Sequence, residues 1–127
     1  MKASAEIVIE RPLGAVWEWA SDPVHWHRWE PDLGRVDPGD YEIVEKTAPR
    51  RQVVRSVTGP FPFESTLELS PDVGGTRVRE TVSAGPEDAL ARFLFVVARP
   101  LVRRSMRRRI AGQLVRLKTM VELEAVL

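Results

Sequence analysis

The chain has 127 residues, of which 43% are hydrophobic and 29% are charged, and its net charge is +1. These values are typical of one globular domain with a core of its own, and we expect a single domain over residues 1–127. The absence of cysteine excludes disulfides and thiolate zinc sites. The longest apolar run, Phe93–Ala98, has six residues, whereas a bilayer span needs about 20. The first residues lack the apolar stretch of a signal peptide, so we expect a cytoplasmic protein.

The N-terminal part predicts a strand followed by two short helices. Ala3–Glu10 alternates apolar and polar residues, as a half-buried strand does. Pro12 is suited to the first turn of a helix, and Pro23 favours its end. A second helical turn is predicted over Val24–Trp29, before Pro31.

The middle of the chain predicts an antiparallel sheet. After a loop that has room for a rudimentary strand, four strand-like runs follow: Tyr41–Thr47, Arg51–Thr58, Phe63–Ser70 and Thr76–Ser83. The segment Asp72–Gly75 between the last two runs predicts a hairpin turn. Short connections of this kind join antiparallel neighbours.

From Pro86 the pattern is helical to the end. A long helix of about 25 residues is predicted, with helical turns over Glu87–Arg99 before it and a kink or break at Pro100. One arc of its surface holds Met106, Ile110, Leu114, Leu117, Val121 and Glu124. The order of elements predicts an α+β fold, in which a curved antiparallel sheet of about five strands packs on the long C-terminal helix.

Four segments in this order carry a family resemblance. They are the opening AEIVIERPLGAVWEWASDP, the W-x-x-W-x-P of Trp26, Trp29 and Pro31, the hairpin LELSPDVGGTRVRET and the ending LVRLKTMVELE. The chain resembles the START-like (SRPBCC) superfamily of helix-grip proteins, and within it the polyketide cyclase/dehydrase-like group. The resemblance implies a cavity between sheet and C-terminal helix that binds lipids, sterols, polyketides or other apolar molecules. A minority of such proteins are cyclases or dehydratases.

The sequence departs from that family at one place. Members usually have two further strands between the tryptophan motif and the run that begins here at Tyr41, where this chain has only about ten residues. The shortened sheet leaves either an open cavity or an exposed edge, and an exposed edge is a template for pairing with another chain. We therefore hypothesise a homodimer formed along that edge.

A cluster of aromatic and imidazole side chains, His25, Trp26, His27 and Trp29, raises the question of a metal or catalytic site. Histidines two residues apart do not face the same way on a helix, and no further ligand type accompanies them. Packing is the favoured interpretation, since buried tryptophans contribute large apolar areas. Trp29 or His25 can still touch a ligand at the mouth of a pocket. No metal and no cofactor is expected.

Two charged residues are predicted to face the core. Glu80 shares the apolar face of its strand with Val78 and Val82, and Arg103 lies on the apolar arc of the long helix. The alternatives are a structural ion pair, exposure of both side chains at an open edge, and a polar anchor for a ligand. A buried Glu80 could also serve as a general base.

The ligand-binding residues that we predict lie on the inner sides of sheet and helix: Trp29, Phe63, Leu67, Val78, Glu80, Arg103, Met106 and Ile110. The favoured function is binding of a small hydrophobic or amphipathic molecule. One alternative is a cyclase or dehydratase, with Glu80, His25 and Arg103 as candidate catalytic residues. The other is a membrane-surface or protein-interaction module.

The last alternative depends on an uneven charge distribution. Residues 99–127 contain eight bases and two acids, whereas residues 1–98 contain 11 bases and 16 acids. The run RRSMRRR, with Arg104 and Arg108 facing away from the apolar arc, is either a solvated face or a contact with an anionic membrane. Nucleic acid is not expected, because no stacking aromatics are interleaved with these arginines.

Overall fold

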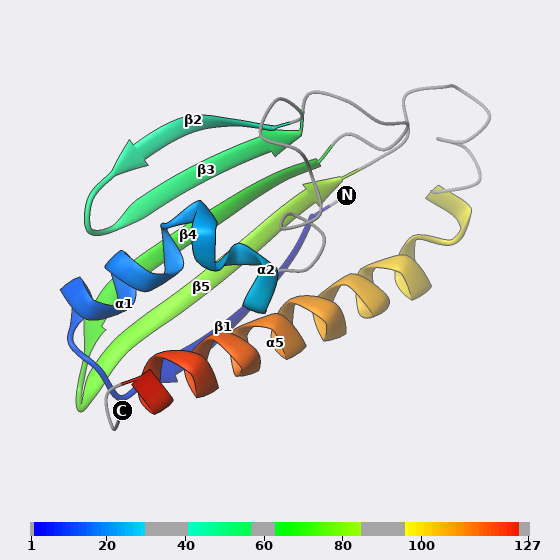
Figure 1. Cartoon of the computed structure of the whole chain (residues 1–127). Helices are drawn as coiled ribbons and strands as arrows, with labels where there is room; N and C mark the ends of the chain where they lie inside the picture. The colour runs from blue at the N-terminus through cyan, green and yellow to red at the C-terminus, as the bar shows by residue number, and fades with distance from the viewer. Residues whose placement is uncertain (1, 30–40, 57–62, 85–95, 125–127) are drawn as a thin grey trace.

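The structure, a computed structural model, describes residues 2–29, 41–56, 63–84 and 96–124. Five strands and four helical segments follow one another in this part of the chain (Figure 1). They are β1 (Lys2–Ile9), α1 (Leu13–Ala20), the 3-10 turn η1 (Pro23–His25), α2 (Trp26–Trp29), β2 (Tyr41–Thr47), β3 (Arg51–Ser56), β4 (Phe63–Asp72), β5 (Gly75–Ala84) and α5 (Arg99–Glu124). This order confirms the predicted fold class.

The sheet is antiparallel throughout, with the strand order β1-β5-β4-β3-β2. The segment that contains α1 and α2 therefore carries the chain from one edge strand, β1, to the other, β2. In the described part of the chain β2 has a neighbour on one side only, and nearly all of its residues are exposed. A register shift between Ile43 and Glu45 interrupts its pairing with β3.

The helices all cover the same face of the sheet (Figure 1), which gives two layers with the core between them. On α5 the buried residues are Ile110, Gln113, Leu114, Leu117 and Val121, and Met106 is partly buried. The predicted apolar arc is confirmed except at Glu124, which is exposed. Glu124 is the last residue of α5, where the helix ends and its carboxylate remains in water.

The start of α5 differs from the predicted kink. Pro100 lies in the first turn, where its missing N–H removes no helical hydrogen bond. The first bond of this turn joins the Val102 N–H to the Ala98 carbonyl, at 3.0 Å. Arg99, the first residue of α5, is exposed. The helical turns predicted over residues 87–95 and the strand considered in 32–40 lie outside the described residues.

The outer face of the sheet carries acids and bases in alternation. Arg51 contacts Glu45 and Glu68 at 3.2 Å each, Arg77 contacts Glu6 and Asp72 at 3.1 and 2.6 Å, and Arg55 pairs with Glu42. The hydrogen bond from Arg77 holds the pKa of Asp72 below its ordinary value, and Glu42 raises the pKa of Arg55. These three arginines therefore have partners on neighbouring strands.

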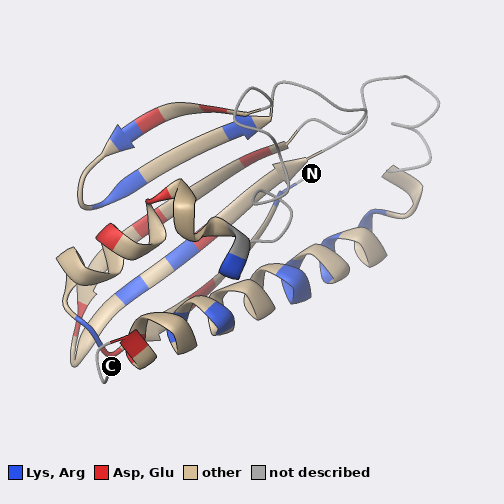
Figure 2. Ribbon diagram, viewed as in Figure 1, with Lys and Arg blue, Asp and Glu red and all other residues tan. Residues whose placement is uncertain are grey.

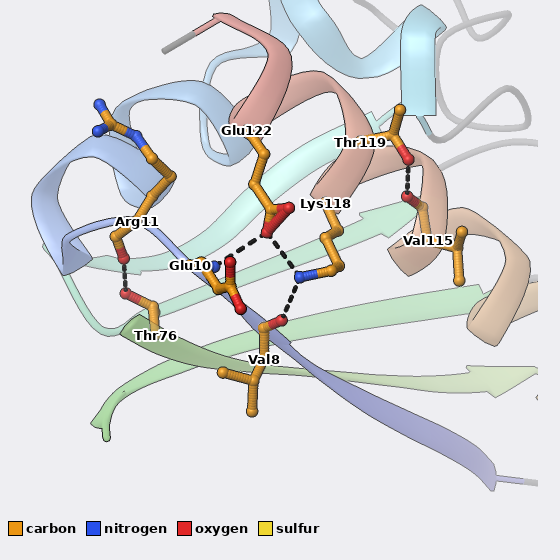
Figure 3. A network of polar contacts seen from close by, with 8 residues as sticks. All are labelled: Val8, Glu10, Arg11, Thr76, Val115, Lys118, Thr119 and Glu122. Atoms are coloured by element: carbon orange, nitrogen blue, oxygen red, sulfur yellow. Dashed lines mark hydrogen bonds and ion pairs between the residues drawn. The ribbon is translucent and has the colours of Figure 1, made fainter. Parts of the chain in front are cut away.

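A polar tether joins the end of β1 to the last turns of α5 (Figure 3). The Lys118 ammonium donates to the Val8 carbonyl at 3.0 Å and to Glu122 Oε2 at 2.6 Å. The same carboxylate accepts from the Glu10 backbone N–H at 3.0 Å. The Lys118 hydrogen bond is the largest cause of a lowered pKa of Glu122, followed by the Glu10 N–H. Helix and edge strand are thereby linked beside the core.

No helix in the described ranges is both long enough and apolar enough to cross a membrane.

Candidate functional site

The inner face of the sheet carries polar side chains in a mainly apolar surface. The strand register places two adjacent rows across four strands, first Gln52, Leu67, Glu80 and Ala5, then Val54, Ser65, Val82 and Ala3. Gln52, Ser65 and Glu80 are buried in these rows. The helices cover this face, so these polar groups lie within the core rather than at its rim.

Glu80 is the most unusual of them, since its exposed fraction is 0%. The Ser65 hydroxyl donates a hydrogen bond to Glu80 Oε1 at 3.2 Å. Ser65, and not Arg103, is the hydrogen-bond donor that the described residues supply to this carboxylate. Burial of a carboxyl group is unfavourable unless it is neutralised, paired or hydrogen-bonded. The inward direction predicted for Glu80 is confirmed.

Three buried N–H groups lack acceptors in the described part of the chain. One is Nε of Arg11, just before α1, and the other two are Nε1 of Trp29, on α2, and Nε of Arg103, on α5. The helices α2 and α5 contact each other. By contrast, Nε1 of Trp26 donates to the Ala20 carbonyl at 3.1 Å. Buried donors are nearly always satisfied in folded proteins. The helices α2 and α5 therefore each carry a buried donor that the described residues do not satisfy.

A small hollow lies between α1, α2 and the inner face of the sheet. Its volume is about 10 Å³, which is room for one water molecule. The Gln52 amide beside it donates to the Ser21 carbonyl at 3.3 Å. Its walls are formed by Ala20, Trp26, Trp29, Gln52, Val54, Ser65 and Leu67. It brings together two predicted ligand-binding residues, Trp29 and Leu67, and the hydroxyl that binds Glu80.

The other predicted ligand-binding residues lie on the same inner side. Val78 and Ile110 are buried, whereas Phe63 and Met106 are partly buried and pack against the core. Arg103 is partly buried as well. Sequence reasoning missed Ser65 and Gln52. The alternation of β4 already placed Ser65 on the same face as Phe63 and Leu67, and that signal could have found it.

His25 lies elsewhere. Its ring stacks on Trp19 with centroids 4.3 Å apart, and its Nδ1 lies 2.9 Å from the Trp19 carbonyl. Because a carbonyl only accepts, Nδ1 carries the proton and Nε2 of the neutral ring is an acceptor. His25 borders an outer groove of about 570 Å³, whose other walls are Arg11, Ala15, Glu18, Trp19, Asp22, Val121 and Glu124. The predicted catalytic candidates thus do not share one hollow among the described residues.

The tryptophan and histidine cluster is mainly packing, as predicted. Trp19, Trp26 and Trp29 are buried, and Trp26 also meets Tyr41 edge to face at 5.2 Å. The side chain of His27 lies outside the described residues. Within the described residues no group of three His, Asp or Glu side chains is arranged to hold a metal ion.

No family model and no curated protein matches the sequence. Solved structures do match the fold. A protein from Thermus thermophilus is similar at 21% identity and a TM-score of 0.65, with 98% of this chain and 99% of that chain covered. The AHSA1-like protein from Aeromonas hydrophila is similar at 19% identity and a TM-score of 0.64, covering 100% of this chain and 96% of that one.

A third similar structure is a protein of the dynemicin biosynthetic locus. It shares 15% identity at a TM-score of 0.67, over 95% of this chain and 47% of that chain. Identities this low establish the fold and leave the chemistry to the residues of the site. The described residues form a helix-grip fold, with a curved five-stranded sheet packed on a long C-terminal helix.

Proposed function

We propose that this protein binds a small amphipathic molecule between the curved sheet and α5, as a member of the START-like superfamily that the sequence resembles. The observation that supports the proposal is that two of the three buried N–H donors without acceptors among the described residues, Trp29 Nε1 and Arg103 Nε, belong to helices that contact each other. Leaving such donors unsatisfied is unfavourable, and a ligand oxygen would satisfy them. Likeness in fold to a protein of a biosynthetic locus agrees with a role in handling a small molecule.

The apolar part of the ligand would contact the side chains that we predicted from the sequence. Phe63 and Met106 are the partly buried members of this set, so they are the ones best placed to change contacts when a ligand enters. Leu67, Val78 and Ile110 form the buried floor. The oxygen-bearing part would lie toward Trp29 and Arg103. Apolar pockets select by shape, so a carbonyl or hydroxyl group on an apolar frame is the class we propose.

Native mass spectrometry of the protein purified from its own host tests the proposal. Spectra recorded intact and after denaturing release would show an apolar, oxygen-containing molecule bound in a defined ratio. Trp29→Phe and Arg103→Met should then retain less of this molecule, whereas His25→Asn, in the outer groove, should retain as much as the wild type. A protein that is empty from every preparation, or equal retention by all variants, would refute the assignment.

The buried carboxylate of Glu80 favours one second candidate, a cyclase- or dehydratase-type enzyme. In this alternative Glu80 moves a proton and Arg103 holds a developing negative charge on a ligand oxygen. Glu80→Gln keeps the size of the side chain and removes its basicity. An enzyme would lose turnover of the released molecule in this variant while keeping its affinity, and a binding protein would show no turnover in either form.

We further propose that two copies of the chain pair along β2, the exposed edge of the sheet. Ile43 and Val44 are both exposed there. Antiparallel pairing centred on Val44 would place Glu42 of each copy opposite Lys46 of the other, an attractive pairing of charges. Light scattering during size exclusion should give a dimer mass for the wild type and a monomer mass for Val44→Lys. A monomer mass for both proteins would refute the dimer proposal and would not affect the proposal of a ligand site.

A further inference from the structure

The outward face of α5 carries a dense positive charge. Between Arg99 and Val121 the chain has eight bases and no acid. Figure 2 shows the same arrangement, with basic positions recurring along α5 and acidic ones confined to its C-terminal end. The exposed bases are Arg99, Arg104, Arg107, Arg108, Arg109 and Arg116. Such a surface attracts anions of any kind. Three further properties of this face indicate which class of anionic partner it binds.

The first property is that two of these charges, on Arg104 and Arg108, are not neutralised by described residues. On the sheet, Arg51, Arg55 and Arg77 each contact a carboxylate. Within the described contacts, by contrast, Arg104 and Arg108 have neither an ion pair nor a side-chain hydrogen bond. They are also four residues apart, a spacing at which like charges repel on a helix. An external anionic surface would relieve this repulsion.

The second property is exposed apolar surface among the arginines. Val96, Val97 and Leu101 are 61%, 67% and 74% exposed, and Val115 is 54% exposed further along the helix. At helical spacing, Leu101 and Val115 share one face with Arg104 and Arg108. Such apolar groups suit the boundary between lipid headgroups and acyl chains. They offer nothing to phosphodiesters, and the exposed large hydrophobic residues of the described ranges include no aromatic side chain for base stacking.

The third property is the accessibility of this face. The opposite side of α5 packs on β1 and β5, so the face with Leu101, Arg104 and Arg108 points away from the sheet (Figure 1). We propose that this face, named here the arginine face, docks on an anionic lipid bilayer with α5 lying in the plane of the surface. The arginines contact headgroup phosphates and carboxylates, and Leu101 with the valines before α5 inserts at the boundary. None of these residues belongs to the proposed ligand site, so each proposal can fail alone.

Vesicle co-sedimentation of the full chain tests the docking. Vesicles of phosphatidylcholine with about 30% phosphatidylserine should bind the protein at about 0.05 M NaCl and much less at about 0.5 M, while phosphatidylcholine alone should bind little. Each basic residue near such a surface contributes about a fivefold factor in partitioning. Arg104→Gln with Arg108→Gln should therefore reduce partitioning about 30-fold.

A matched control is available away from α5, in the β2–β3 turn and on β5. Arg50 and Arg79 are also exposed, and Arg79 lies opposite Glu6 and Glu68 in the strand register. Arg50→Gln with Arg79→Gln removes the same net charge and should change partitioning less than threefold. Leu101→Ser should remove the binding that persists at high salt. Circular dichroism would verify that every variant is folded.

Three results would overturn the proposal. The first is equal partitioning on vesicles with and without phosphatidylserine. The second is an equal loss in the two double variants, which would indicate a response to net charge alone. The third is salt-dependent binding to duplex DNA or RNA without binding to vesicles and without an effect of Leu101→Ser, which would assign the arginine face to nucleic acid instead.

Discussion

Trp26 and Trp29 differ at the level of one hydrogen bond. Both are 2% exposed, but among the described residues only Trp26 has an acceptor for its indole N–H, the Ala20 carbonyl. Replacing either by Phe removes the N–H and leaves an aromatic ring. We expect Trp26→Phe to cost about 1 kcal/mol more of unfolding free energy than Trp29→Phe, because only the former loses a bond and leaves an orphan carbonyl. Urea unfolding at pH 7 measures both, and equal losses would contradict the hydrogen-bond assignment.

Gly75 and Gly112 give a second contrast between single residues. A Cβ at Gly75 would lie 2.0 Å from the Ile9 carbonyl oxygen, whereas a Cβ at Gly112, in α5, would meet nothing within 4 Å. We expect Gly75→Ala to destabilise the protein by more than about 2 kcal/mol, as a backbone clash in a paired strand would. Gly112→Ala should stabilise it by about 0.5–1 kcal/mol through helix propensity. Thermal unfolding of both variants checks the two signs.

For a single residue, the sequence predicts which face of a strand its side chain occupies better than it predicts the hydrogen-bond partner of that side chain. The alternation of β5 is sufficient to turn Glu80 inward with Val78. It does not name Ser65, because a partner on another strand depends on the register between the strands, which no pattern within one strand contains.

Among the elements, the tether between β1 and α5 has a definite pH dependence. The pKa of Glu122 is lower in the folded chain than its ordinary value, so its ionised form stabilises the fold above that value. This contribution is lost as the pH falls through the lowered pKa. Glu122→Gln should therefore lose about 0.5–1 kcal/mol at pH 7, a figure reduced for partial exposure, and progressively less as the pH is lowered toward about pH 3.

The measurement for the tether is urea unfolding of wild type and Glu122→Gln across that pH range. Glu124→Gln is the control, because Glu124 is exposed at the end of the same helix and has no contact with Lys118 among the described residues. A difference that stays constant down to about pH 3 would show that Glu122 acts through packing and not through its charge.

The elements themselves were predictable because each carries its own periodicity and stop signals. Five strands, two short helices and the long helix all appear where apolar spacing indicates them. The helix has no kink at Pro100, because this residue lies in the first turn of α5, and the interruption lies two residues earlier, at the turn of Ala98. A proline can break a helix or begin one, and the sequence alone did not distinguish the two positions.

For the whole molecule, the order of the elements was enough to predict the sheet packed on α5. The hollows were not predictable, since they depend on how α1 and α2 settle on the sheet. The short turn η1 places His25 in the outer groove beside Arg11, while Trp29, four residues later, lies on the inner side. The sequence shows only that His25 and Trp29 are close along the chain. It does not show that they border different hollows.

The packing of α5 against the rest of the protein is uneven along the length of the helix. All fully buried residues of the 26-residue helix lie between Ile110 and Val121, and none lies between Arg99 and Arg109. A free helix of about 11 residues is marginal in water, so the first half depends on continuing from the anchored half. Backbone amides should therefore exchange with deuterium faster in the first half, even though one unbroken helix contains both. As the temperature rises, the residue at which stable helix begins would shift from Arg99 toward Ile110, while the rest of the protein stays folded.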